Sequence, residues 1–291
     1  MPEHIDFRDQ ISKNKVKSFF LIVSVFLVLV LLGYVISLAF SPGYFFIIMI
    51  AAIIFSLFYI SINYYKSDKI AISSVGAKEA DKTKDKQFYD VVESLTIASG
   101  LPMPKLYVMN SPQINAFASG RDPKHAIVCV TRGSLDKLEK KELEGVLAHE
   151  MSHIANYDIR YMTLATVMVG IISIVSEIFL RSLWFQNGND KKNGGIFILI
   201  GIILAIIAPI VVYLVQLAIS RKREYSADAS AVKFTRYPRG LIDALKKIQT
   251  ENQPEKKVAK AIAPLFFSNP LKNLSSTHPP IEKRIEVLEK M

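Results

Sequence analysis

The chain has 291 residues, of which 51% are hydrophobic, and its mean hydropathy of +0.27 excludes an ordinary soluble domain. Its formal net charge of +10 is compatible with either nucleic acid or an anionic lipid surface as a partner. Because the sequence has no basic–aromatic module or recognition motif, we expect a lipid bilayer beside this charge and no nucleic acid.

Two uncharged apolar blocks follow a basic tail at residues 1–17. Residues 18–40 and 44–65 are each long enough to cross a hydrocarbon core of about 30 Å as a helix. The short link Ser41-Pro42-Gly43 joins them, so residues 18–65 are predicted to be a transmembrane hairpin. The first block is too long for a signal peptide, and no small-residue cleavage site follows it.

The polar block at residues 66–162 is expected to be the first part of a catalytic domain. Apolar residues at helical spacing predict a helix over residues 78–99, which Gly100-Leu101-Pro102 ends. Three short apolar runs predict the strands of a small β-sheet, namely residues 106–109, 114–118 and 126–131, with a turn at residues 120–124. Cys129, the single cysteine, is expected to be a small core residue in a reducing compartment.

The pentapeptide His149-Glu150-Met151-Ser152-His153 is the most specific motif in the chain. On a helix beginning at Lys141, the two imidazoles project from one face and can grip a single zinc ion. Glu150 lies beside them and can accept a proton from water. The uncharged run Gly145-Val146-Leu147-Ala148 before the motif indicates a buried helix. The alternative is a pair of buried or capping histidines with no metal.

A catalytic zinc ion needs a third protein ligand, for which Glu224 is the best candidate. Glu224 and Asp228 are four residues apart, so a helix presents both on one face. Glu224 can bind the metal while Asp228 accepts the outer N–H of a ligating histidine, which fixes the ring. The alternative is a solvated acidic helix face beside the basic run at residues 221–223.

Residues 163–219 hold two further apolar stretches, 163–180 with Glu177 and 196–219 with Pro209. They are expected to form a second apolar hairpin that crosses the membrane, or else a buried hairpin placed shallowly in it. No stop signal separates the zinc-motif helix from Thr163, so we expect that helix to run almost directly into this hairpin. The metal site would then lie close to the membrane surface.

The chain after the second hairpin, residues 220–291, is expected to complete the catalytic domain with proline-broken helices. Orientation follows from the basic residues that flank the apolar blocks. They precede the first block and follow the second and fourth, although residues 181–192 carry a mild contrary signal. The balance predicts that both termini and the active site are cytoplasmic.

Four motifs in the same order resemble the HtpX-type membrane zinc proteases, which are related to the CAAX prenyl endopeptidases. The resemblance covers roughly residues 15–290 and rests on residues 115–120, 149–153, 223–228 and 277–285. It implies a mainly α-helical, multi-span membrane protein with a small β-sheet and a cytoplasmic, gluzincin-like zinc peptidase domain. The prenyl endopeptidases have more spans and a longer chain, so the sequence is less like them.

The resemblance also implies roles for particular residues. One Zn²⁺ per subunit would be held by His149, His153 and Glu224, with Glu150 as general base. The segment Asn115-Ala116-Phe117-Ala118 would be the edge strand that pairs with substrate backbone, although Asn115 can equally be an ordinary turn or strand-edge residue. Because the tail would lie near the site, two further residues are candidate oxyanion or regulatory groups, namely His278 and Arg284. His278 can alternatively ligate zinc at rest or cap the helix after Pro279.

The expected activity is that of a membrane-bound, zinc-dependent endopeptidase in a prokaryotic cytoplasmic (inner) membrane. The resemblance implies quality control, with misfolded or damaged membrane proteins as substrates. The alternative within this class is a processing protease for prenylated or other specific membrane proteins. A scaffold with a structural metal would not need Glu150, and an ion transporter would need more intramembrane ligands than Glu177 and Gln216.

Overall fold

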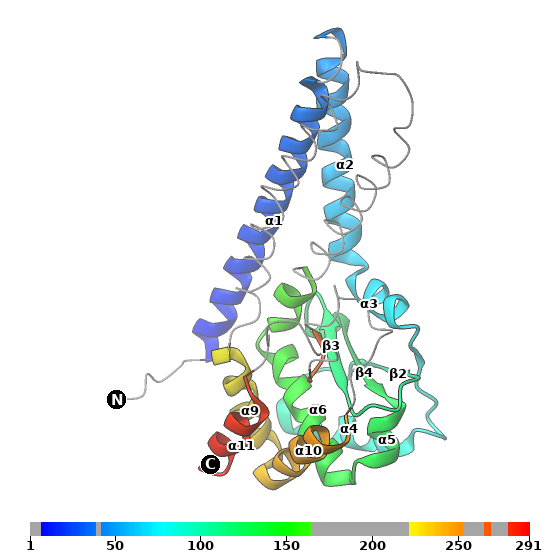
Figure 1. Ribbon diagram of the computed structural model, residues 1–291, viewed down its shortest axis with the longest axis vertical. Helices are drawn as coiled ribbons and strands as arrows, with labels where there is room; N and C mark the ends of the chain where they lie inside the picture. The colour runs from blue at the N-terminus through cyan, green and yellow to red at the C-terminus, as the bar shows by residue number, and fades with distance from the viewer. Residues whose placement is uncertain (1–6, 39–41, 165–220, 253–264, 269–278) are drawn as a thin grey trace.

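Two long helices rise from a domain in which further helices surround a small sheet (Figure 1). The computed structural model describes residues 7–38, 42–164, 221–252, 265–268 and 279–291. The prediction of a mainly helical chain with a small sheet is confirmed. Most of the expected second apolar hairpin, residues 165–219, and His278 lie outside the described residues.

The described elements follow one another from the long hairpin through the sheet to the terminal helices. The helices are α1 (Phe7–Leu38), α2 (Phe45–Tyr65), α3 (Ser67–Val75), α4 (Lys86–Ser99), α5 (Arg132–Lys137), α6 (Lys140–Ala155), α9 (Arg221–Thr235), α10 (Pro238–Glu251) and α11 (Ile281–Leu288). The strands are β1 (Lys78–Glu79), β2 (Lys105–Met109), β3 (Ala116–Gly120) and β4 (Ala126–Thr131). Short 3-10 helices span Pro42–Tyr44 and Pro123–His125.

Helices α1 and α2 form a hairpin whose outer surface is apolar. The stretches Asn14–Leu31 and Phe45–Tyr65 are long and apolar enough to cross a membrane. Only 6% of the second stretch is buried inside the protein, whereas the core helix of a soluble domain would be mostly covered. Gly33 allows the helices to approach, because a Cβ there would clash with Ala52. By length and composition, both helices therefore fit the expected membrane hairpin.

The sheet has the strand order β1-β2-β4-β3, with β2 parallel to β4 and the outer pairs antiparallel. Alternate side chains of the strands therefore enter two separate apolar clusters. On one face, Ala116, Ala118 and Val128 pack with α4, α6 and α10. On the other face, Phe117 and Cys129 pack with α3 and with Phe266. Strand β3 lies at one edge of the sheet, and this places it beside α6.

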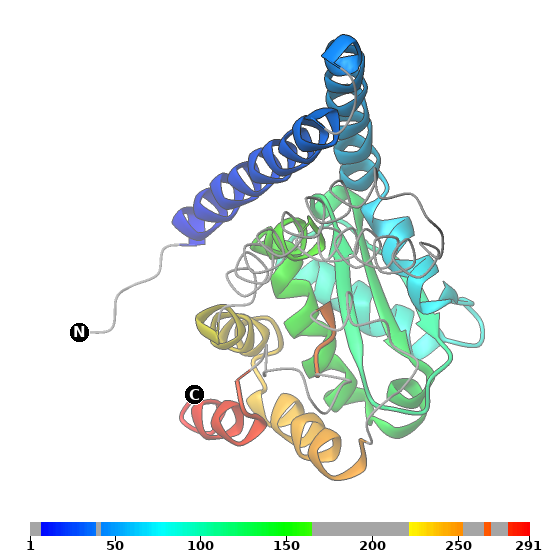
Figure 2. The same cartoon turned by 45° about the horizontal axis from the view of Figure 1, so that its top comes forward.

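Helix α6 is the centre of the domain, as its uncharged run predicts. Gly145-Val146-Leu147-Ala148 and the zinc motif that follows are buried. In Figure 2, α9, α10 and α11 (yellow to red) lie on the side of α6 away from the strands. A Cβ at Gly145 would come within 2.6 Å of the Leu241 backbone nitrogen of α10, so glycine permits this close crossing.

Three details of the sequence prediction are wrong. The helix expected over residues 78–99 begins only at Lys86, because Lys78–Glu79 pairs with β2 as strand β1. Strand β3 is shifted from residues 114–118 to 116–120. Helix α6 stops at Ala155 rather than running on to Thr163, since Tyr157 takes a left-handed backbone conformation with φ of 59°. A new helical segment at residues 158–164 follows this turn.

Candidate metal centre and active site

His149, His153 and Glu224 converge in the middle of the domain, and all three side chains are buried. The two Nε2 atoms are 3.1 Å apart. Glu224 places Oε2 at 3.5 Å from the Nε2 of His149 and Oε1 at 3.7 Å from that of His153. Two ligands of a tetrahedral zinc ion, each at about 2.0–2.1 Å, lie about 3.4 Å apart. The donor set and its spacing therefore fit zinc.

The orientation of His149 is set by two residues on the other side of its ring. Its Nδ1 lies 2.8 Å from Oδ1 of Asp228, which comes from the next turn of α9 after Glu224. Arg284 of α11 donates to both oxygens of Asp228, and its guanidinium stacks on the Phe267 ring at 4.6 Å. With Nδ1 engaged in this way, Nε2 faces the ligand cluster.

His153 has an equivalent support that the sequence analysis missed. Oδ2 of Asp158 lies 3.0 Å from Nδ1 of His153, and Asp158 is fully buried. Asp158 is five residues after His153, which is about 140° around an uninterrupted helix. The turn at Tyr157 breaks the helix and brings the carboxylate back to the ring. An acidic residue shortly after the motif was the only sequence signal for this contact.

The electrostatics of the cluster favour a cation in its centre. Burial lowers the pKa of His149, but hydrogen bonds to Asp228 and Glu224 outweigh burial and raise the pKa to about 9. Burial raises the pKa of Asp228, but Arg284 and His149 outweigh it and hold this pKa below its usual range. Two buried carboxylates thus stabilise positive charge at His149, which a metal ion can supply in place of a proton.

Glu150 lies beside the ligands and connects them to the edge strand. The backbone N–H of Ala118 donates to its Oε2 at 2.8 Å. Burial raises the pKa of the Glu150 carboxyl, although the neighbouring His149 and His153 oppose this. A carboxylate in a poorly solvated position takes up a proton more readily than an exposed one. The expected general base is therefore placed where it can accept a proton next to the ligand cluster.

In strand β3, the backbone carbonyl of Ala116 and the backbone N–H of Ala118 point away from β4. The carbonyl of Ala116 accepts from the N–H of Phe267 at 2.8 Å. The side chain of Asn115 holds the same segment, because it donates to the Ser268 carbonyl at 2.8 Å and accepts from the Ser268 N–H at 3.0 Å. Segment 265–268 thus lies against the edge that a substrate strand would use.

The sequence profile of peptidase family M48 matches residues 82–291, which include every ligand candidate described above.

The chain belongs to peptidase family M48.

Relatives of this M48 peptidase match it over nearly their whole length. The Protease HtpX homolog of Caldanaerobacter subterraneus is 45% identical over 289 residues, and the match covers 96% of this chain and 96% of the relative. That of Dictyoglomus thermophilum is 44% identical, covering 98% of this chain and 95% of the relative. The crystal structure of S. mikatae Ste24p matches with a TM-score of 0.50 at 18% identity, over 96% of this chain and 66% of that one, and shows a shared fold.

These matches and the two apolar helices make the M48 peptidase a membrane metalloprotease. Arg284, one of the two expected oxyanion or regulatory groups, lies on the Nδ1 side of His149, 3.2 Å from that atom. This position is behind the ring rather than at Nε2, which faces His153 and Glu224. The geometry therefore does not support an oxyanion role for Arg284, and its contacts are those of a positioning residue.

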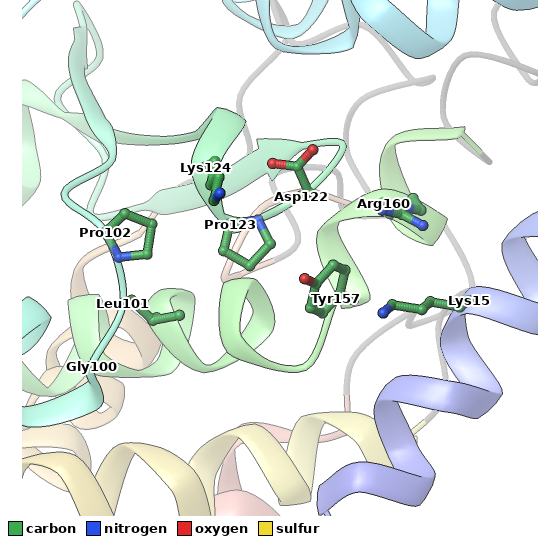
Figure 3. A pocket seen from close by; sticks show the side chains of 9 residues that line it. All are labelled: Lys15, Gly100, Leu101, Pro102, Asp122, Pro123, Lys124, Tyr157 and Arg160. Atoms are coloured by element: carbon green, nitrogen blue, oxygen red, sulfur yellow. The ribbon is translucent and has the colours of Figure 1, made fainter.

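An open groove of about 890 Å³ lies outside the ligand cluster of the peptidase, against the turn that ends α6. Figure 3 shows Lys15 reaching from α1 toward Tyr157 and Arg160. The Nζ atom of Lys15 lies 4.7 Å from the centroid of the Tyr157 ring, and the guanidinium carbon of Arg160 lies 5.3 Å from it. Asp122 also lines the groove. These contacts hold the turn at Tyr157 against the base of α1.

Proposed function

We propose that this M48 member is a zinc-dependent endopeptidase that hydrolyses peptide bonds of misfolded or damaged membrane proteins. The observation that carries the proposal is the convergence of His149, His153 and Glu224 around one point, with Glu150 beside them. A structural metal site has no need of a buried carboxylate that is placed next to the ligands without belonging to them. That feature favours catalysis over a scaffold.

The residues divide the chemical work between them. His149, His153 and Glu224 would hold a zinc ion, and the chemistry it would supply there is Lewis acidity toward the scissile carbonyl and toward water. Glu150 accepts the proton of the attacking water at Oε1 or Oε2 and passes it to the leaving amine. Asp228 and Asp158 hold the two imidazoles by their Nδ1 atoms, so that both Nε2 atoms keep their direction during turnover.

Substrate is proposed to bind along β3 as an added strand. The edge position of β3 and the outward Ala116 carbonyl and Ala118 N–H support this mode. An extended peptide would replace Phe267 at Ala116 and Glu150 at Ala118. Glu150 would then be released from the strand toward the scissile bond. Strand addition reads backbone rather than side chains, which suits substrates that share only a lack of folded structure.

The membrane hairpin supports membrane proteins as the substrate class. Arg160 stacks on Tyr64 at 6.0 Å, and Arg121 donates to the Tyr65 carbonyl at 3.1 Å, so the domain is docked on the end of α2. The basic residues around the apolar blocks support a cytoplasmic placement of both termini and the site, in an inner membrane. Processing of prenylated proteins is the alternative, for which the shared fold with Ste24p is weak support.

The test compares wild type with Glu150→Gln, both purified in detergent and loaded with zinc. Glu144→Gln is the matched control, since Glu144 is on the same helix and pairs with Lys141 at its surface. We expect wild type and Glu144→Gln to cleave an unfolded membrane-protein reporter, and chelator or Glu150→Gln to abolish cleavage. Equal cleavage by Glu150→Gln would rule out the general-base role.

A second arm of the experiment separates the two substrate classes. The same reporter is offered folded, unfolded and as a short prenylated peptide. Quality control requires that the unfolded form is cleaved fastest and at several sites. Cleavage restricted to the prenylated peptide, at a single bond, would replace this proposal with processing.

A further inference from the structure

We propose that α1, the first membrane helix, is part of the metal centre, and that its Asn14 is a positioning residue that holds His153 through Asp158. This inference rests on the proposed zinc site. It assigns a role to a residue that lies 144 positions from Asp158 in the sequence and outside the matched family region. The membrane hairpin would then do more than anchor the protease.

The contact is a continuous chain of buried hydrogen bonds. The Asn14 amide nitrogen donates to Oδ1 of Asp158 at 2.6 Å, and Oδ2 of Asp158 lies 3.0 Å from Nδ1 of His153. Asn14 is 3% exposed, Asp158 0% and His153 4%. In such a poorly solvated place each bond is stronger than at the surface, and each lost partner is costly.

Both hydrogens of the Asn14 amide are used on the turn that ends α6. The second goes to the backbone carbonyl of Asn156 at 3.0 Å. One side chain of α1 therefore fixes both the backbone before Tyr157 and the carboxylate after it. This matters because Asp158 reaches His153 only through that turn. Arg223 approaches Oδ1 of Asp158 at 3.9 Å, which is too long for a direct hydrogen bond.

Packing along α1 keeps Asn14 in place. Leu21, Val25 and Leu29 of α1 form a buried cluster with Tyr161 and Leu164 of the segment that follows Asp158. The helix and the segment are thus joined over several turns, with Asn14 at one end of the contact. A displacement of α1 relative to the domain would break the bond from Asn14 to Asp158. The hydrogen bond on His153 would then lose its fixed direction.

The inference is tested by zinc affinity in the full-length protein, measured by competition with a chromophoric chelator. Asn14→Leu replaces the polar amide by an apolar side chain of similar size. Ser18→Ala is the matched control, because Ser18 is equally buried on α1 and, within the described residues, donates to the Asn14 carbonyl rather than to the turn at Tyr157. We expect Asn14→Leu to weaken zinc binding about tenfold and Ser18→Ala to leave it unchanged.

A double-mutant cycle shows whether Asn14 acts through Asp158. Asp158→Ala removes both carboxylate oxygens and is expected to weaken binding about 10- to 100-fold, and adding Asn14→Leu to it should weaken binding no further. If the fold-losses of zinc affinity in the two single variants multiplied in the double variant, Asn14 would act by another route and the inference would be overturned. Wild-type zinc affinity in Asn14→Leu would also overturn it. If Asn14→Leu does not fold, Asn14→Ser provides the same comparison.

Two controls separate this inference from the proposed function. Wild type must bind zinc, and His153→Ala must lose it; failure of either contradicts the zinc site itself. With both satisfied, only the Asn14 variants decide the role of α1. The d–d absorption of the Co²⁺-substituted protein gives a second readout. Because the Co²⁺ bands depend on the direction of the ligands, Asn14→Leu, which frees the His153 ring, should change them, and Ser18→Ala should not.

Discussion

Arg284 donates to Asp228 through two hydrogen bonds, at 2.9 Å from Nε and 2.6 Å from Nη2. Both residues are almost fully buried, at 1% and 0% exposure. The Oδ1 atom that accepts from Arg284 also bonds His149. The last helix of the chain thus fixes the carboxylate that orients a candidate ligand. If the cluster holds zinc as proposed, substitutions at this pair should change both stability and metal binding.

Asp228→Asn should destabilise the protein and weaken zinc binding. It leaves the buried Arg284 without its charge partner, which costs about 3–5 kcal/mol. It also replaces one of the two oxygens that Arg284 and His149 share by an NH2 group, so His149 is held less firmly and zinc affinity should fall about 10- to 100-fold. Thermal unfolding and chelator competition measure the two effects. The control is Asp243→Asn, which breaks an exposed pair with Arg239 and should cost less than about 0.5 kcal/mol.

Arg284→Lys distinguishes a positioning role from an oxyanion role. A lysine lacks the planar pair of donors with which Arg284 bonds both oxygens of Asp228, so a positioning role predicts weaker zinc binding in proportion to the loss of activity. Zinc affinity and kcat are measured on the same preparation. An oxyanion donor would behave in the opposite way, with kcat falling about 100-fold while zinc affinity stays at the wild-type value.

Gly145→Ala should lower the melting temperature, although alanine favours a helix by about 1 kcal/mol over glycine. The added Cβ would meet the Leu241 nitrogen at 2.6 Å and its Cα at 2.8 Å, and backbone atoms cannot move aside cheaply. We expect a net loss of about 1–3 kcal/mol. Gly43→Ala is the control, since a Cβ there meets nothing within 4 Å. A melting temperature raised by Gly145→Ala would show that α6 and α10 cross less closely.

Cys129 should resist alkylation in the folded protein. Its side chain is 1% exposed in the cluster between the sheet and α3, and burial raises the pKa of the thiol, so almost no thiolate forms near neutral pH. A maleimide should label the protein only after denaturation. The chain has a single cysteine, so the label reports directly on this face of the sheet. Rapid labelling without denaturant would show that the face opens.

The parts of the site that the sequence predicted depend on local geometry. A helix brings residues four apart to one face wherever it packs, which is why the spacing places His149 beside His153 and puts Glu224 and Asp228 on one face of α9. The apolar runs of β2 and β4 were recognised because both strands are buried in the sheet. The buried course of α6 followed from its uncharged run.

The parts that the sequence did not reveal depend on distant partners. Tyr157 gives no signal of a left-handed conformation, so neither the end of α6 nor the approach of Asp158 to His153 was foreseeable. Lys78–Glu79 is a strand only because β2 lies beside it. Asn14 is an isolated polar residue at the start of an apolar block, and only the folded chain shows its bond to Asp158.

The docking of the domain on the hairpin has a consequence for where substrates are cut. The domain contacts α1 and α2 at their domain-side ends through three separate interactions. Arg160 packs on Tyr64, Arg121 bonds the Tyr65 carbonyl, and Asp158 accepts from Asn14. Three separated attachment points leave little freedom to tilt or swing. Under the proposed function, the protease would therefore cleave peptide bonds at one fixed distance from the bilayer. Substrate segments held nearer to the bilayer or farther from it would not be cleaved.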